Sequence, residues 1–405
     1  MVEKGLNDYF ENFLKKKSIF RNKRALQGNY FPKIIPHREK FIQQVASILA
    51  PSLRLEKPSN IFLYGRTGSG KTLCVKYTTD SILEIAKKNG VNIKVFYLNC
   101  KLKRVADTEY RLIAQLTREF GVEVPATGLP TDEVYKLFVN ALDKEKILLV
   151  IVLDEIDQLV TKTGDEILYN LTRLNSELKK SEISLIGISN DLIFTETLDP
   201  RVKSSLSEEE ILFPPYNALQ LQKILKQRSR TAFNEGVVGE GVVEKCAAYA
   251  AREHGDARRA LELLRVAGEL TERDNKEIID ILYIDQAEDK IERDRISDTI
   301  ENQPKQFKIV LYSILDGLVK QKEKSHLFTG DIYDTYKDLC FKVAVRPLTQ
   351  RRFSDIVAEL DMLGIIHAKV ISKGRYGRTR AIGMSLPNSS IPNIISSVKE
   401  SLNIA

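Results

Sequence analysis

The sequence contains no apolar run long enough to cross a lipid bilayer, and its first residues lack the apolar stretch of a secretion signal. It has only four cysteines, and no two of them form a C-x-x-C pair. This spacing disfavours a zinc site or a disulfide framework and favours buried, reduced thiols. Internal repeats and low-complexity tracts are also absent. We therefore expect a cytoplasmic protein without a membrane partner.

Positive charge is in modest excess, with 62 Lys and Arg against 55 Asp and Glu and a formal net charge of +7. Such a balance permits a polyanionic partner without requiring one. A chain of 405 residues is too long for one ordinary core, so we expect two or three domains. Basic residues cluster at Lys15–Lys17 and at Arg21, Lys23 and Arg24. This cluster is either a solvated arm or a contact for DNA phosphates.

Four apolar runs predict buried strands, and helical patterns separate them. They are Ile61–Tyr64, Val95–Leu98, Ile147–Leu153 and Ile183–Ile188. Uninterrupted apolar strands alternating with helices indicate an α/β fold with a parallel sheet covered on both faces. Residues 218–298 have helical periodicity throughout and predict a small all-helical domain.

The first of these strands runs into a sequence that matches G-x-x-x-x-G-K-[ST], and a helical pattern follows it. The eight positions are Gly65, Arg66, Thr67, Gly68, Ser69, Gly70, Lys71 and Thr72. Glycines allow the backbone N–H groups of such a loop to surround phosphate oxygens at a helix N-terminus. Lys71 can then reach the β- and γ-phosphates of ATP, and the Thr72 hydroxyl can bind Mg²⁺. The segment predicts a P-loop that binds ATP or ADP.

Two acids follow the third strand, at the edge of the sheet where ligands bind. We expect Asp154 to hold Mg²⁺ together with Thr72, and Glu155 to polarise the attacking water. The role of Asp157 stays open, since this residue could simply cap the next helix.

The order of these segments resembles that of AAA+ ATPases. The resemblance implies three further residues at the nucleotide: Asn190 as the sensor-1 residue, Arg258 of Gly255–Arg258 as the sensor-2 residue, and Arg201 as an arginine finger acting on a neighbouring subunit. Arg259, next to Arg258, leaves the sensor-2 assignment open by one residue.

The last hundred residues predict three helices and a β-hairpin, the order of a winged helix-turn-helix domain. The third helix spans about Thr349–Leu363 and carries Arg351 and Arg352 at its N-terminal end, where a recognition helix meets DNA. The hairpin tip holds four cations in nine residues and no acid. We expect this tip to contact DNA phosphates through Lys373, Arg375, Tyr376, Arg378 and Arg380. A winged helix that contacts protein is the alternative.

Together, these modules resemble the archaeal origin-recognition (Orc/Cdc-type) replication initiators over nearly the whole chain. The resemblance implies that Tyr30 and Ile34 border the adenine, and that a helical insertion at residues 104–128 touches DNA, with Lys101, Lys103 and Arg104 as candidates. It divides the chain into a basic arm at 1–30, an AAA+ domain at 31–217, a helical lid at 218–300 and a winged-helix domain at 301–405.

The resemblance implies a weak regulatory ATPase that binds double-stranded origin DNA and helps to recruit or load the replicative helicase. It also implies a nucleoid-associated location and contacts with paralogous initiators. A second hypothesis stays open: an AAA+ regulator or transposition-type ATPase without origin specificity. A metabolic P-loop kinase is disfavoured because a helical lid and a winged helix have no role in one.

Overall fold

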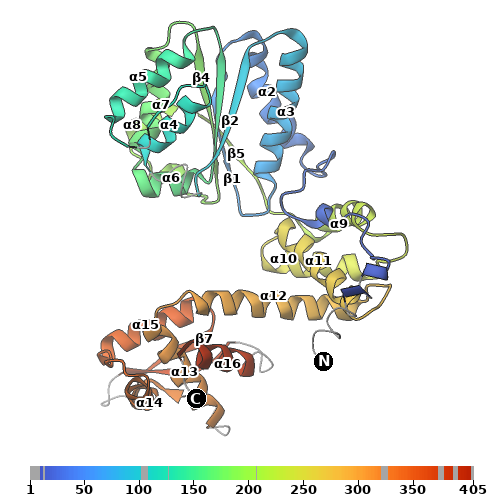
Figure 1. Ribbon diagram of the computed structural model, residues 1–405, viewed down its shortest axis with the longest axis vertical. Coiled ribbons are helices and arrows are strands. Elements are labelled where there is room, and N and C mark those ends of the chain that lie inside the picture. The colour runs from blue at the N-terminus through green and yellow to red at the C-terminus, as the bar shows by residue number, and fades with distance from the viewer. Residues whose placement is uncertain are drawn as a thin grey trace. The chain divides into compact units, whose positions relative to one another are not determined.

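The computed structural model describes residues 10–11, 14–101, 108–125, 127–206, 208–320, 327–372, 378–385 and 391–402. Its chain forms two compact units, Met1–Asp285 and Gln286–Ala405 (Figure 1). In the described part of the chain, every helix is too short or too polar to span a membrane.

The first unit contains a five-stranded parallel sheet in the order β2-β3-β4-β1-β5. Its strands are β1 (Asn60–Tyr64), β2 (Ile93–Asn99), β3 (Leu148–Asp154), β4 (Glu182–Ser189) and β5 (Glu208–Leu212). The parallel sheet predicted from the four apolar runs is thus confirmed. The sequence did not reveal β5, because this strand lies at the edge of the sheet and begins with three glutamates rather than an apolar run.

Helices cover both faces of this sheet (Figure 1). The helices α2 (Glu39–Leu49) and α3 (Lys71–Asn89) share one core with Leu148, Val150 and Val152 of β3. The alternate residues of β3 pack into a second core on the opposite face, as the two-residue period of a strand requires. The helices of that core are α4 (Glu109–Arg118), α5 (Thr131–Leu142), α6 (Ile156–Thr163), α7 (Glu166–Arg173) and α8 (Pro200–Leu206).

Three helices form the lid at the end of the first unit: α9 (Ala218–Ala232), α10 (Val242–Glu253) and α11 (Ala257–Arg273). Polar caps fix where two of them begin. Asn217 forms a capping box with Gln220 at the start of α9, and the Asp256 side chain caps α11. Short 3-10 turns complete this unit: η1 (Lys23–Leu26), η2 (Ala50–Arg54), η3 (Leu174–Ser176) and η4 (Phe194–Thr197).

Two features of this unit bear on the expected domain plan, which stays a prediction. Ala25 and Leu26 of η1 are buried against the lid, so part of the stretch 1–30 is packed rather than a solvated arm. The division between the two compact units falls after Asp285. It lies within α12 (Ile281–Glu301), and an uninterrupted helix gives no signal in the sequence at such a division.

The second unit is a winged helix-turn-helix, which confirms the predicted fold. It contains α13 (Lys305–Lys320), β6 (Leu327–Phe328), α14 (Thr329–Lys342), α15 (Gln350–Met362), β7 (Ile366–Ser372), β8 (Arg378–Met384) and α16 (Ile391–Leu402). The strands form an antiparallel sheet in the order β6-β8-β7, and the hairpin pairs Ile366 with Met384 and Ser372 with Arg378. The sequence analysis missed β6 and α16, although Ile394, Val398 and Leu402 of α16 pack into the core of this unit.

Candidate nucleotide-binding site and nucleic-acid interface

Two positions of the loop after β1, Gly65 and Gly68, leave no room for a side chain. A Cβ on Gly65 would lie 2.4 Å from the Phe213 carbonyl oxygen, and one on Gly68 would lie 1.7 Å from Asp256 Oδ1. Both residues also have a left-handed backbone, with φ of +150° and +69°. The loop therefore lies directly between the sheet and the N-terminal cap of α11, and α3 begins immediately after it. This is the strand, loop and helix arrangement of a phosphate-binding site.

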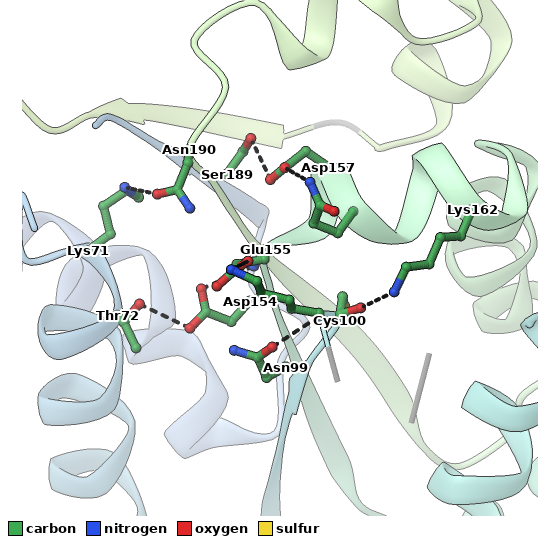
Figure 2. A network of polar contacts seen from close by, with 12 residues as sticks. Lys71, Thr72, Asn99, Cys100, Asp154, Glu155, Asp157, Lys162, Ser189 and Asn190 are labelled. Carbon is green, nitrogen blue, oxygen red and sulfur yellow. Dashed lines mark hydrogen bonds and ion pairs between the residues drawn. The ribbon is translucent and has the colours of Figure 1, made fainter. Parts of the chain in front are cut away.

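Lys71 is the first residue of α3 and is only 5% exposed. Its ammonium donates hydrogen bonds to the Gly65 and Arg66 carbonyl oxygens, at 2.6 and 3.0 Å. A third bond, of 3.0 Å, reaches Asn190 Oδ1 at the end of β4. Burial lowers the pKa of Lys71 to about 8, and the nearby Asp154 carboxylate opposes this shift. Lys71 thus joins the loop to Asn190, as Figure 2 shows.

Asp154 ends the fully buried strand β3 and is itself 7% exposed. The Thr72 hydroxyl donates to its Oδ2 at 3.0 Å, and the Tyr97 hydroxyl donates to the same oxygen. Burial raises the pKa of Tyr97, and its bond to Asp154 raises it further. Hydroxyl and carboxylate oxygens are the ligands that Mg²⁺ prefers, so the Thr72 and Asp154 pair fits this ion.

Sequence analysis missed Tyr97, which pairs with Val152 in the neighbouring strand. The available signal was a hydroxyl within an otherwise apolar run. A buried hydroxyl needs a partner, and the end of a parallel sheet provides one.

Glu155 lies beside this pair at the start of α6, with a left-handed backbone at φ 57°. Its Oε2 lies 3.9 Å from Lys101 Nζ. The Ser189 hydroxyl donates to Asp157 Oδ1 at 3.1 Å, so Asp157 ties α6 to the end of β4 (Figure 2). The N-cap residue of α6 is Glu155, so Asp157 does not hold that position and lies in the first turn of the helix.

The segment before α2 forms the opposite wall of the pocket. Tyr30 and Ile34, which the resemblance places beside the adenine, line this pocket together with Arg228 of the lid. The Arg228 guanidinium stacks 4.6 Å from the centre of the Tyr30 ring and donates to the Tyr30 carbonyl oxygen at 3.4 Å. Sequence analysis did not identify Arg228, since one arginine in a helix carries no distinguishing pattern.

On the lid side, Arg258 lines the pocket, whereas Arg259 Nε lies 3.3 Å from Glu253 Oε2. The position of Arg258 in the pocket lining fits the sensor-2 role, which stays a prediction. The Asp256 side chain accepts from the Arg258 backbone N–H at 2.7 Å, and the Ala257 N–H donates to the Gly68 carbonyl oxygen at 3.4 Å. The N-terminus of α11 is therefore held against the P-loop.

A buried arginine that sequence analysis did not assign to the site donates hydrogen bonds to the backbone of the P-loop and of the segment before the lid. Arg38 is 1% exposed and donates to the carbonyl oxygens of Ser69, Pro214 and His37, at 2.8, 2.6 and 3.1 Å. Its guanidinium also stacks 3.8 Å from the centre of the Tyr216 ring. Burial lowers the pKa of Arg38. Since the Tyr216 N–H donates to the Gly255 carbonyl oxygen, Arg38 joins the P-loop to the segment that leads into the lid.

Arg201 lies outside this pocket. It is an exposed residue of α8, and its Nε is 3.1 Å from Asp199 Oδ1. Lys101 is also exposed. The candidates Lys103 and Arg104 lie outside the described residues.

In the second unit, Arg351 and Arg352 are exposed in the first turn of α15. Arg352 Nη1 lies 3.7 Å from Asp355 Oδ2. Arg380 is half-buried, and its Nη1 donates to the Ser354 carbonyl oxygen at 2.6 Å, which fastens the hairpin to α15. Lys373, Arg375 and Tyr376 lie outside the described residues, as does the side chain of Arg378.

Three family profiles match successive stretches of the chain. They are an AAA domain at residues 54–192, a Cdc6 AAA+ ATPase-type lid domain at 222–289 and the CDC6 C-terminal winged helix domain at 298–393.

The chain is 50% identical to the ORC1-type DNA replication protein of Thermococcus onnurineus over 398 residues, 97% of this chain and 95% of that one. It is 49% identical to ORC1-type DNA replication protein 1 of Methanosarcina mazei over 383 residues, 95% and 92% of the two chains.

Among solved structures, the Aeropyrum pernix ORC1 protein in complex with DNA is 44% identical, with a TM-score of 0.79 and coverage of 95% and 98%. The Aeropyrum pernix ORC2 protein, solved as ADPNP-ADP complexes, is 22% identical with a TM-score of 0.60 over 95% and 99% of the two chains, and supports the fold alone.

Proposed function

The chain belongs to the ORC1/Cdc6 family of AAA+ replication initiators, and from this premise we propose that it binds duplex origin DNA under the control of ATP and ADP. The observation that carries the proposal is the similarity, over nearly its full length, to an ORC1 protein that was solved with DNA. The pocket between the P-loop and α11 supports the nucleotide part of the proposal.

In the proposed site, the P-loop N–H groups and Lys71 bind the phosphates, while Tyr30 and Ile34 border the adenine. Thr72 and Asp154 would hold Mg²⁺, which neutralises phosphate charge when bound. Glu155 orients and polarises the attacking water. Asn190 and Arg258 line the pocket from the end of β4 and from the lid, where they would reach the γ-phosphate.

Hydrolysis in this site acts as a slow switch rather than as turnover. Arg258 and the Asp256 cap lie on the lid helix that meets the P-loop, so a change at the γ-phosphate alters the contact between lid and core. The nucleotide state thereby biases which conformation is populated. The exposed Arg201 would act on the nucleotide of a neighbouring subunit.

DNA binding is assigned to the second unit. Arg351 and Arg352 lie at the end of α15 that a recognition helix turns toward DNA. Lys373, Arg375, Tyr376, Arg378 and Arg380 extend the contact along the hairpin, and Lys101, Lys103 and Arg104 add a second contact from the first unit. We further propose the replicative helicase and paralogous initiators as partners, and a nucleoid-associated location in the cytoplasm.

Footprinting of the full chain on the organism's own origin DNA tests the proposal. Protection of a discrete repeated site by the wild type is expected, and Lys71→Ala should alter how that protection responds to ATP and ADP. Uniform coverage of any duplex would favour the AAA+ regulator or transposition-type ATPase, and an absence of DNA binding would refute both.

A further inference from the structure

The positive charge of this protein is concentrated in one segment of the first unit. From Asn12 to Arg38 the sequence has eight Lys and Arg residues and no Asp or Glu. Since the whole chain carries +7, everything outside these 27 residues has a net charge of −1. A surface that serves only solubility mixes both signs, whereas a surface that binds a polyanion does not.

We call residues 14–36 the basic strap, because this segment is fastened along the lid. The Arg21 and Asn22 N–H groups both donate to the Ala232 carbonyl oxygen, at 2.8 and 2.9 Å. The Asn234 N–H donates in turn to the Ile19 carbonyl oxygen at 3.1 Å. These backbone contacts fix the path of the segment independently of its charges.

Apolar packing strengthens this attachment. The Phe20 ring stacks on Phe233 with centres 4.9 Å apart, and it fills the space that a Cβ on Gly268 would occupy, at 2.7 Å. Ile19, Ala25 and Leu26 are buried. The apolar side chains of residues 15–26 thus pack inward or are half-buried, which leaves lysine and arginine to form the outer surface.

The cations themselves are exposed: Lys15, Lys16, Lys17, Arg21, Lys23 and Arg24. Within the part of the chain that the structure describes, only Lys23 among them forms an ion pair, with Glu269 at 2.9 Å. Within residues 15–26, burial of Ile19 and stacking of Phe20 leave no exposed apolar side chain to anchor a protein partner. The exposed apolar side chains of the strap lie outside this stretch, at Leu14, Phe31 and Ile34, and the last two line the pocket. The regularly spaced phosphates of a DNA backbone can be bound by exposed cations on a fixed protein backbone, without apolar anchors.

We propose that the basic strap binds the phosphate backbone of duplex DNA, as a contact of the first unit separate from α15 and its hairpin. This inference rests on the proposed function and adds to it a DNA contact carried by the lid. The preordered backbone lowers the entropy cost of ordering the segment on DNA, so the contact contributes affinity rather than sequence preference.

The test uses the full chain with Lys15, Lys17, Arg21 and Arg24 changed to serine, which leaves the Lys23–Glu269 pair intact. Its affinity for duplex DNA should fall at least tenfold at low salt. The slope of log affinity against log salt should become shallower by about 0.9 for each phosphate that the variant no longer neutralises. Binding of ADP should equal that of the wild type, because none of the four residues lines the pocket.

A matched control removes four exposed lysines elsewhere in the same unit: Lys87, Lys88, Lys179 and Lys180, each changed to serine. This control has the same net charge as the strap variant. The inference is overturned if both variants lose DNA affinity equally, or if the strap variant keeps the wild-type slope of log affinity against log salt. If that slope is unchanged and the strap variant no longer binds an acidic protein ligand, an acidic protein is the class of partner indicated instead.

A third variant, Arg351→Ala with Arg352→Ala, separates this inference from the proposed function. If it loses DNA affinity while the strap variant matches its control, the strap inference fails and the proposed function stands. If the wild type itself does not bind duplex DNA, the proposed function fails first.

Discussion

The nucleotide pocket and the exposed start of α15, the proposed DNA contact, use charge in opposite ways. In the pocket, Lys71 and Asp154 are 5% and 7% exposed, and each has two or more protein partners. At the start of α15, the Arg352 side chain is 73% exposed and has one carboxylate at 3.7 Å. Buried, interlinked groups should respond strongly and jointly to substitution, whereas exposed cations should respond weakly and independently.

The largest effect is expected at Lys71. Changing Lys71 to alanine removes the cation proposed to bind the phosphates, and charge-assisted contacts of this kind contribute about 3 kcal/mol. The affinity for ADP, measured by isothermal titration calorimetry, should fall about a hundredfold. Lys88→Ala, at the exposed end of the same helix, should leave the affinity unchanged. A Lys71→Ala protein that binds ADP within threefold of the wild type would contradict the expectation that buried, interlinked charges respond strongly to substitution.

Next comes the contact between the P-loop and the lid. Gly68 and Gly90 have nearly equal φ, +69° and +68°, so alanine imposes similar backbone strain of about 1 kcal/mol at both. A Cβ at Gly90 meets nothing within 4 Å, whereas one at Gly68 overlaps Asp256. The free energy of unfolding of Gly68→Ala should therefore fall by about 2 kcal/mol more than that of Gly90→Ala. Urea denaturation of both variants measures the difference, and equal losses would show that loop and lid are independent.

A smaller effect is expected from pH. Burial lowers the pKa of Lys71 to about 8, and phosphate beside the ammonium favours the protonated form. As the pH rises through 8, the empty pocket loses this proton while the occupied pocket retains it, so binding becomes coupled to proton uptake. Affinity for ADP should be about tenfold weaker at pH 9 than at pH 7.

Lys71→Arg provides the control, because a guanidinium stays protonated across this range. Its affinity should be lower overall but flat between pH 7 and pH 9. A wild-type profile that is equally flat would place the titrating group elsewhere.

The smallest single effects are expected at α15. Arg351→Ala and Arg352→Ala should each weaken DNA binding by about 1 kcal/mol and make the salt slope shallower by about one. The double variant should equal the sum within about 0.5 kcal/mol, in contrast to the pocket. Fluorescence anisotropy with labelled duplex at several salt concentrations measures the affinities and their salt slopes. Lys337→Ala on α14 is the control. If the loss of binding free energy in the double variant differs widely from the sum of the single losses, the two arginines are coupled and the contrast with the pocket is wrong.

The sequence predicted those parts of the site that are contiguous motifs, and missed those that the fold brings together from distant segments. Lys71, Thr72 and Asp154 were identified because a phosphate loop and a strand-end acid are contiguous patterns. Tyr97 and Arg38 were not assigned to the site, since each reaches the pocket or its loop from a distant segment that only the folded sheet brings close. The parallel sheet was predicted from apolar runs, yet β5 was missed because an acidic edge strand lacks that signal. The helix α16 was missed although Ile391, Ile394, Ile395 and Val398 have the spacing of an apolar helix face.

The attachment of the basic strap also bears on how the protein is made. Its residues leave the ribosome before the lid does, but they dock on Ala232, Phe233 and Gly268, which are synthesised later. Because domains fold as their contacts emerge during translation, the wall that contains Tyr30 cannot settle until most of the first unit is complete. A growing chain would thus complete the strands of its sheet before the wall that contains Tyr30 could settle, and the full pocket would form only once the lid is made.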